Sequence, residues 1–316
     1  MNICGRGSVT RDRWGSIEIA LTCITLVQYL YLCRAAWVSG VGREVQPIQS
    51  TTSNSAALAL GGRVAMVTGA SGGIGRVLAR RYARAGASVA LVARREAELE
   101  QTAQLVGGEG GESLQLVADI RDEEQCRDVV TRAVARFGRL DVLVNNAAIP
   151  GADQPISQAD AANWQEVLAT NLLAPVMLSR EVLRQNMISR GSGNIQFLSS
   201  AAARSVRPGK GHYAASKLAL SALCQTLALE VGAAGIRVNT LVIGAVAGEL
   251  LDRYIARQAA QQQVEIDEAC KRITAGNALG RLVESGEVAD VSVWLASDAA
   301  SAITGQDIFV TGGQRV

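Results

Sequence analysis

The sequence contains very little of the residue type on which many catalytic sites depend. It has one histidine among 316 residues, His212. One chain therefore cannot supply a zinc site with two or three histidine ligands, and a Ser-His-Asp triad would have to use His212 itself. We predict no metal site, and we expect His212 to lie at the surface or at the mouth of a cavity.

Cysteine and net charge exclude further classes. None of the six cysteines forms a C-x-x-C pair, which argues against structural zinc. Three lie in the first 33 residues and three are scattered, as in a reduced intracellular protein rather than a disulfide scaffold. Lys and Arg total 31 against 29 acidic residues, so no charge excess indicates nucleic acid binding. A hydrophobic content of 48% indicates a globular protein with a large core.

The chain divides near residue 58. Residues 1–57 show no sustained helix or strand period, and their apolar run, residues 19–33, is shorter than the ~20 residues of a spanning helix. Four interpretations of this N-terminal extension stay open. It is a disordered segment or the result of a start codon assigned too far upstream, a membrane anchor, a cleaved targeting peptide, or a functional element. We expect a cytoplasmic protein, with membrane association through residues 19–33 as the alternative. Residues 1–57 are expected to be dispensable for catalysis.

Residues 58–316 alternate strand-like and helix-like segments throughout. This pattern predicts an α/β fold, a Rossmann-type doubly wound parallel sheet in a single domain after the short N-terminal extension. Strands are expected at residues 63–68, 88–93, 114–118, 142–145, 194–198, 237–242 and 307–310. Helices are expected at residues 74–85, 96–106, 123–137, 164–173, 176–188, 213–231, 249–275 and 287–296.

A glycine cluster follows the first expected strand directly. It reads Thr68-Gly69-Ala70-Ser71-Gly72-Gly73-Ile74-Gly75. Gly69 permits a tight turn, Gly73 lets the backbone approach a pyrophosphate, and Gly75 lets the helix pack close to the sheet. The free N–H groups and dipole of the following helix favour phosphate. The cluster predicts a dinucleotide site that includes Ser71 and Ile74; the alternative is a turn that needs glycine and binds nothing.

The end of the second expected strand indicates which dinucleotide binds. NAD-preferring proteins place an acidic residue there for the adenine ribose hydroxyls, whereas this chain has Ala93 followed by Arg94 and Arg95. No carboxylate repels a 2′-phosphate, and the Arg94 guanidinium can bind one with two hydrogen bonds. The sequence therefore favours NADP over NAD. If Arg94 and Arg95 only begin a solvated helix, the choice stays open.

Tyr213 and Lys217 are placed for proton transfer. Their i,i+4 spacing in an apolar helical stretch puts both side chains on one helix face. Hydride transfer to a ketone places charge on oxygen, so a proton donor must stand there. A free tyrosine has a pKa near ~10, and a nearby ammonium is expected to lower it. Tyr213 is therefore the candidate general acid and base.

These motifs resemble the short-chain dehydrogenase/reductase superfamily, in particular its 3-oxoacyl-acyl-carrier-protein-reductase-like members. The resemblance rests on the T-G-x-x-x-G-x-G spacing of residues 68–75 and on Tyr213-Ala214-Ala215-Ser216-Lys217, and it extends from about residue 60 to the C-terminus. It implies an NADP-dependent enzyme that moves a hydride between nicotinamide C4 and a carbonyl or secondary alcohol carbon of a small molecule. It also implies a homodimer or homotetramer formed through the Tyr213 helix and the helix before it.

The resemblance assigns further residues. Ser200, at the family spacing before Tyr213, would hydrogen-bond the substrate oxygen, while Ser199 should point to the other side of its strand. Lys217 would also bind the nicotinamide ribose. Asn171 would kink its helix and hold a water on the proton relay of the lysine.

On the adenine side, Asp119 would hold the amino group and Ile120 would pack on the ring. A plain helix-cap role for Asp119 is the alternative. Two further members of the expected cofactor set are Asn146, after the fourth strand, and Ile243, after the sixth.

Three positions depart from the family pattern. Ala148 replaces a glycine, Ile243 a proline, and Gly248 a threonine that usually helps to hold the nicotinamide. These departures put the fine geometry in doubt but not the cofactor fold. Residues 249–275 supply the substrate lid in relatives, and fatty acyl thioesters, steroid-like rings, quinones and sugars all remain open. A non-catalytic NADP-binding sensor or scaffold is the alternative function.

Overall fold

The computed structural model describes residues 59–314. The N-terminal extension, residues 1–57, and its apolar run lie outside the described residues, so every expectation about them stays a prediction. The chain divides into the units Met1–Ala56 and Ala57–Val316, and all elements below belong to the second.

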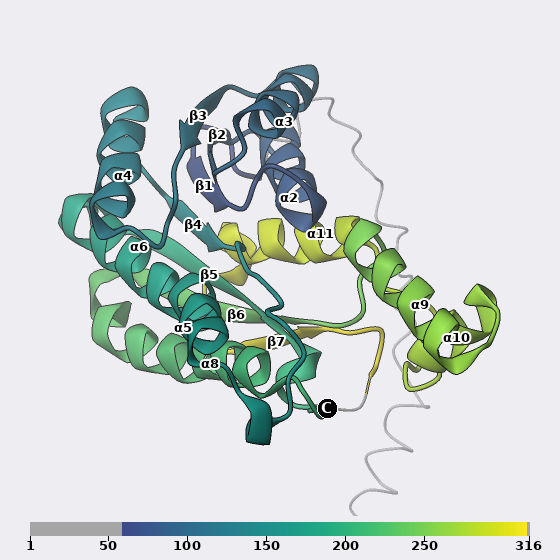
Figure 1. Cartoon of the computed structure of the whole chain (residues 1–316). Coiled ribbons are helices and arrows are strands. Elements are labelled where there is room, and N and C mark those ends of the chain that lie inside the picture. Colours follow the sequence, from purple (N-terminus) through teal and green to yellow (C-terminus); the bar gives the residue numbers. More distant parts are fainter. Residues whose placement is uncertain (1–58, 315–316) are drawn as a thin grey trace, which may run out of the picture. The chain divides into compact units, whose positions relative to one another are not determined.

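Seven parallel strands form one sheet in the order β3-β2-β1-β4-β5-β6-β7 (Figure 1). They are β1 (Val64–Thr68), β2 (Ser88–Ala93), β3 (Ser113–Val117), β4 (Val142–Asn145), β5 (Gly193–Ser200), β6 (Ile236–Ile243) and β7 (Asp307–Val310). The strand order reverses between β1 and β4, which is where such sheets open a ligand crevice beyond their carboxyl ends. The predicted doubly wound fold is confirmed.

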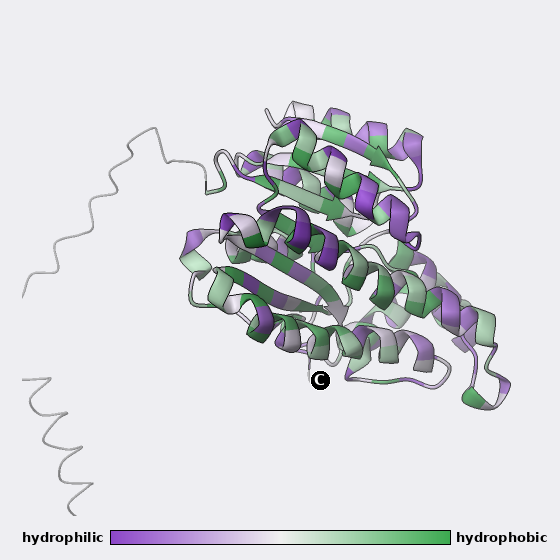
Figure 2. Ribbon diagram, turned by 90° about the vertical axis from the view of Figure 1, so that its left-hand side faces the viewer, coloured by the Kyte–Doolittle hydropathy of each residue, from purple (hydrophilic) through white to green (hydrophobic). Residues whose placement is uncertain are grey.

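Alternate side chains of each strand feed two cores on opposite faces of the sheet. Val64 and Met66 of β1 pack with the helices of one face, whereas Ala65 and Val67 pack with those of the other. The first face carries α4 (Glu123–Phe137), α6 (Ala174–Val182) and α8 (Gly211–Val231); the second carries α2 (Gly73–Arg84), α3 (Glu96–Gly108) and α11 (Ser285–Ala296). Figure 2 shows the largely hydrophobic strands between helices of mixed outer surface.

Helix α8 is the longest of the described helices. It packs against β5 and β6 through side chains such as Leu220 and Cys224. Within residues 59–314, a stretch over this helix, Gly211–Ala234, is by length and composition the one segment apolar enough to cross a membrane. About 33% of the most apolar part of this stretch is buried inside the structure, so packing against the sheet accounts for only part of its apolarity.

The two helices predicted at residues 164–173 and 176–188 form one continuous helical path. It runs through α5 (Ala161–Leu168), a π-helical turn (Ala169–Leu173), α6, a second π-helical turn (Leu183–Met187) and α7 (Ile188–Arg190). Proline has no N–H to donate within a helix. Here Pro175 is the second residue of α6, just after the first π turn ends at Leu173, so the path continues where the sequence predicted a break.

The predicted helix over residues 249–275 is instead two helices, α9 (Glu249–Gln262) and α10 (Ile266–Thr274). Gln263 separates them with a φ of 52°, a left-handed conformation that ends a helix. The pair has a small core of its own around Ile255, Ala259 and Ala269. Figure 1 shows α9 and α10 projecting from the sheet and its flanking helices.

Candidate active site

A cavity of about 1750 Å³ lies along the carboxyl edge of the sheet, from the loop after β1 to α9 and α10. Nearly all of the predicted site residues line it: Gly69, Ser71, Gly73, Ile74, Gly75, Arg94, Asp119, Ile120, Asn146, Ser200, Tyr213, Lys217 and Ile243. Asn171 is the exception, because it is fully buried behind the wall. The structure therefore brings together residues that are far apart in the sequence.

The glycine loop leads from β1 into α2 and leaves the first turn of that helix open. Gly72, the residue before α2, provides no side-chain cap, so the first N–H groups of the helix can meet a phosphate. A Cβ at Gly75 would lie 2.2 Å from the carbonyl oxygen of Gly69. Helix and loop can approach this closely only because Gly75 has no side chain. The residues present therefore fit a dinucleotide pyrophosphate.

Thr68 joins the ends of β1 and β4, a role that the sequence analysis missed. Its Oγ1 accepts hydrogen bonds from the N–H groups of Asn146 and Ala147, each at 3.0 Å. The Asn146 side chain donates in return to the Thr68 carbonyl at 2.7 Å. These bonds fix both walls of the crevice where the strand order reverses. The sequence did contain a signal for this role, since Thr68 is the first residue of the glycine motif at residues 68–75.

Arg94 and Arg95 differ in how many hydrogen bonds and ion pairs they form with other side chains. The Arg94 side chain is 57% exposed, and its Nη1 lies 4.0 Å from Asp119 Oδ2. Arg95 donates to Ser71 Oγ at 3.1 Å and pairs with Glu98 at 2.8 Å. Arg94 is therefore the more available guanidinium beside the cofactor end of the cavity.

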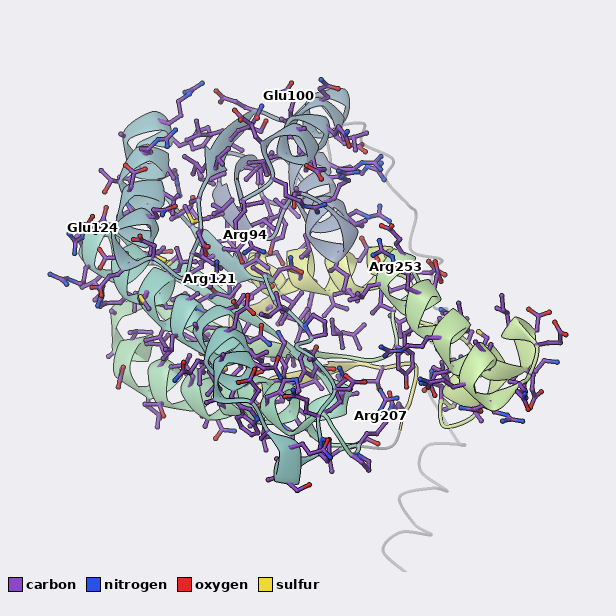
Figure 3. The ribbon with its side chains drawn as sticks, in the orientation of Figure 1. Arg94, Glu100, Arg121, Glu124, Arg207 and Arg253 are labelled. Atoms are coloured by element: carbon purple, nitrogen blue, oxygen red, sulfur yellow. The ribbon has the colours of Figure 1, made fainter. Side chains whose placement is uncertain are left out.

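Arg121 is a charged lining residue that the sequence analysis did not single out. Its guanidinium hydrogen-bonds both carboxylate oxygens of Asp119, and these bonds are the main cause that holds the pKa of Asp119 below its usual range. An adenine amino group that bound Asp119 would therefore share this carboxylate with Arg121. The alternative cap role of Asp119 is wrong, because Asp122 caps α4. Figure 3 labels Arg94 and Arg121.

Ser200 and Tyr213 meet where β5 ends and α8 begins. A hydrogen bond from Ser200 lowers the pKa of the Tyr213 phenol, but burial acts in the opposite direction and is larger, so that pKa is raised. Ser199 points elsewhere, as expected, and donates to the Lys217 carbonyl at 2.7 Å. Both side chains line the cavity, and Ser200 Oγ also accepts a hydrogen bond from the Ala202 N–H at 3.2 Å.

Lys217 lies one turn after Tyr213 and is 3% exposed. Its ammonium donates to the Leu198 carbonyl at 2.7 Å and lies 6.0 Å from the Tyr213 ring centroid. Burial lowers the pKa of Lys217 to about 8. The expectation that Lys217 lowers the pKa of Tyr213 is not met in this structure, because burial raises that pKa and the Ser200 hydrogen bond, not Lys217, opposes it.

Asn171 lies inside the first π turn and holds the loop after β4. Its Oδ1 accepts from the Ile149 N–H at 2.8 Å, and its Nδ2 donates to the Ile149 carbonyl and to Ser216 Oγ. Ile149 lines the cavity. Asn171 thus positions the cavity wall, and its role on a proton relay stays a prediction.

His212 is not at the surface, contrary to expectation. It is 1% exposed, its Nε2 lies 3.1 Å from the Pro150 carbonyl, and its ring meets Trp164 edge-on at 6.0 Å. A polar side chain beside Tyr213 gave no sign of this burial, because both contacts come from residues far back in the sequence.

Gly248, the position where the family has threonine, begins α9. Its φ is 145°, a region that side-chain-bearing residues rarely adopt. A threonine at position 248 would therefore be strained in this conformation, directly before α9 starts.

One class of protein is defined by this combination of strand order, glycine loop and Ser200–Tyr213–Lys217 group. A family model described as enoyl-(acyl carrier protein) reductase matches residues 69–315. The relative named "Granaticin polyketide synthase putative ketoacyl reductase 1", from Streptomyces violaceoruber, is 37% identical over 268 residues, which are 83% of this chain and 98% of the relative. The chain belongs to the short-chain dehydrogenase/reductase family. It is therefore an NAD(P)-dependent oxidoreductase that acts on CH–OH or C=O groups.

Two solved structures are similar over most of their length. A single-residue variant of actinorhodin polyketide ketoreductase with NADPH is 34% identical, with a TM-score of 0.76 over 80% of this chain and 97% of that chain. NAD⁺-bound xylitol dehydrogenase is 29% identical, with the same TM-score of 0.76 over 80% of this chain and 99% of that chain. The two neighbours hold different nicotinamide cofactors, so the fold alone leaves open which one this chain prefers.

Proposed function

We propose that this chain is an NADP(H)-dependent carbonyl reductase in which Tyr213 is the general acid and base. The observation that carries the proposal is that Ser200, Tyr213 and Lys217 line the same cavity as the glycine loop. A cofactor that extends from that loop along the carboxyl edge of the sheet would bring its nicotinamide toward these three side chains.

Each of these side chains has its own part in the reaction. Reduced nicotinamide supplies a hydride to the carbonyl carbon when it is bound. Tyr213 gives its phenolic proton to the carbonyl oxygen, and Ser200 donates a hydrogen bond that stabilises the charge developing there. Lys217 would bind the nicotinamide ribose when the cofactor is present; in this structure it does not lower the pKa of the Tyr213 phenol. Asn171 positions the cavity wall through Ile149.

NADP rather than NAD is part of the proposal, and Arg94 supports it. Position 93 is an alanine, so no carboxylate at the end of β2 is available to the ribose hydroxyls. The Arg94 guanidinium is exposed and only loosely paired, and it can bind a 2′-phosphate with two charge-assisted hydrogen bonds. Arg95 can contribute only by weakening its bonds to Ser71 and Glu98.

We further propose a small-molecule carbonyl or alcohol substrate and a homodimer or homotetramer. A cytoplasmic location belongs to the same proposal and is supported by the free thiols of Cys126, Cys224 and Cys270. A non-catalytic NADP-binding sensor is not favoured, because it would need the glycine loop but gives no reason for Ser200, Tyr213 and Lys217 to share the cavity.

A substrate panel tests this function. The purified chain is mixed with NADPH and a series of aldehydes and ketones, or with NADP and secondary alcohols, and the absorbance of reduced nicotinamide is followed. We expect turnover of at least one carbonyl compound and loss of that turnover in Tyr213→Phe. Tight NADPH binding without turnover of any member would instead favour the sensor.

A further inference from the structure

The part of the cavity formed by α9, α10 and the residues just before α8 is strongly basic. Five cationic side chains line it: Arg207, Lys210, Arg253, Arg257 and Arg272. Two carboxylates line the same part, Asp153 and Glu249. The lining therefore carries an excess of positive charge on the side where the substrate rather than the cofactor would lie. Figure 3 shows Arg207 and Arg253 on this side, away from Arg94 and Arg121.

Tyr254, on α9, holds two of these arginines. The Arg207 guanidinium lies 5.3 Å from the Tyr254 ring centroid, and that of Arg257 lies 5.5 Å from the same centroid. Arg207 Nη1 also donates to the Tyr254 hydroxyl at 2.5 Å. Cation–π contacts of this kind fix guanidinium groups without neutralising them. Two like charges are thus held at one ring although they repel each other.

The carboxylates nearby do not balance this pair. Asp153 is shared between Lys210 and Arg257, with Arg257 at 3.6 Å. Glu249 pairs with Arg253, and Arg272 pairs with Glu268. Among residues 59–314, Arg207 forms no salt bridge; its one side-chain hydrogen bond goes to the neutral hydroxyl of Tyr254. A charged guanidinium that lines a cavity without a carboxylate partner is suited to bind an anion from solution.

We propose that Arg207 and Arg257, held by Tyr254, bind an anionic group at the far end of the substrate. This inference rests on the proposed function and narrows its substrate class to carbonyl compounds that carry a carboxylate or a phosphate ester. Both groups present paired oxygens that match the planar fork of a guanidinium. The oxo group would lie toward Tyr213 and the anion toward α9, so that the two ends fix the substrate direction in the cavity.

A matched series of ketones tests the site. Three methyl ketones of equal chain length end in a carboxylate, a phosphate monoester or a neutral carboxamide. We expect kcat/KM for the better of the two anionic ketones to exceed that of the carboxamide by roughly tenfold or more. Arg207→Gln should remove most of this advantage and leave the carboxamide within about threefold. The control is Arg132→Gln, an exposed arginine of α4 paired with Asp128 outside the cavity.

A binding measurement separates this inference from the proposed function. A carboxylate and a phosphate ester without an oxo group are titrated into the enzyme with its cofactor bound, and heat release is recorded. We expect Kd for at least one to rise about tenfold in Arg207→Gln but not in Arg132→Gln. Equal kcat/KM for anionic and neutral ketones, or a Kd unchanged by Arg207→Gln, overturns the inference even if ketones are reduced. If no ketone is reduced, the proposed function fails while this titration still decides whether the anion site exists.

Discussion

The ammonium of Lys217 lies 6.0 Å from the centroid of the Tyr213 ring, one turn away on α8. Burial moves both groups toward their neutral forms: it raises the pKa of the phenol and lowers that of the ammonium to about 8. A raised pKa keeps the proton on the Tyr213 phenol but makes the phenol a weaker acid, so the charge that develops on the substrate oxygen must draw the proton off.

Burying Lys217 should cost stability in a pH-dependent way. Its pKa falls from an ordinary 10.5 to about 8 in the folded chain, so between these values the unfolded state binds more protons and stability rises with pH. Below pH 8 the folded chain bears the full loss of stability from burying the Lys217 ammonium. Each unit of pKa difference corresponds to about 1.4 kcal/mol of free energy of unfolding. We expect Lys217→Met to be more stable than the unmodified chain at pH 7, by about 2–3 kcal/mol.

Thermal unfolding of both proteins from pH 7 to pH 10.5 measures this effect. The advantage of Lys217→Met should stay near its full value up to about pH 8 and then shrink as pH rises toward 10.5. A difference that stays constant with pH would mean that the Lys217 ammonium is not destabilised by burial.

Gly75→Ala should impair cofactor binding, because a Cβ there would lie 2.2 Å from the Gly69 carbonyl oxygen and force the loop away from α2. We expect at least a tenfold rise in the Kd for NADPH, measured by fluorescence titration. Gly107→Ala is the matched control, since a Cβ at Gly107 meets nothing within 4 Å. It should leave Kd unchanged and stabilise α3 by up to about 1 kcal/mol. Similar Kd values for the two variants would contradict the packing argument.

Cofactor preference should depend on Arg94. A charge-assisted pair with the 2′-phosphate is typically worth about 1.5–3 kcal/mol, so kcat/KM should favour NADPH over NADH by at least about tenfold. Ala93→Asp combined with Arg94→Ala should narrow or invert that ratio. Because Arg94 is exposed, the preference should weaken as salt rises. Equal use of both cofactors by the unmodified enzyme at low salt would leave Arg94 as a solvated residue at the start of α3.

Assembly should depend on the outer faces of α6 and α8. Val176 on α6 and Leu218 on α8 are 38% and 46% exposed, and Leu229 is 87% exposed. Apolar side chains on such faces are suited to burial against a second copy. We expect a dimer or tetramer by light scattering at micromolar concentration, and a smaller species for Val176→Glu with Leu218→Glu. A monomeric unmodified chain would contradict this expectation.

Helix ends were predicted well where a glycine follows the helix. Gly86 and Gly138, for example, adopt positive φ just after α2 and α4. Where no glycine marks a break, prediction failed, as at Gln263 between α9 and α10. The π turn before Pro175 also has no sequence signature, so one helical path was predicted as two helices.

The candidate site was predicted as far as its residues lie in local motifs. Ser200, Tyr213 and Lys217 were found because their spacing is fixed along the chain. Arg207 and Tyr254 were not found as a pair, since the contact joins residues 47 positions apart and no local pattern connects them. Burial of His212 was missed for the same reason.

The central claim is that Tyr213 donates the proton to the substrate oxygen. The most direct measurement is kcat of Tyr213→Phe on any carbonyl compound that the unmodified enzyme reduces, with the Kd for NADPH measured in parallel. We predict that kcat falls by about a hundredfold or more while Kd changes by less than about threefold. A variant that keeps most of its kcat, with NADPH bound as before, would contradict the account.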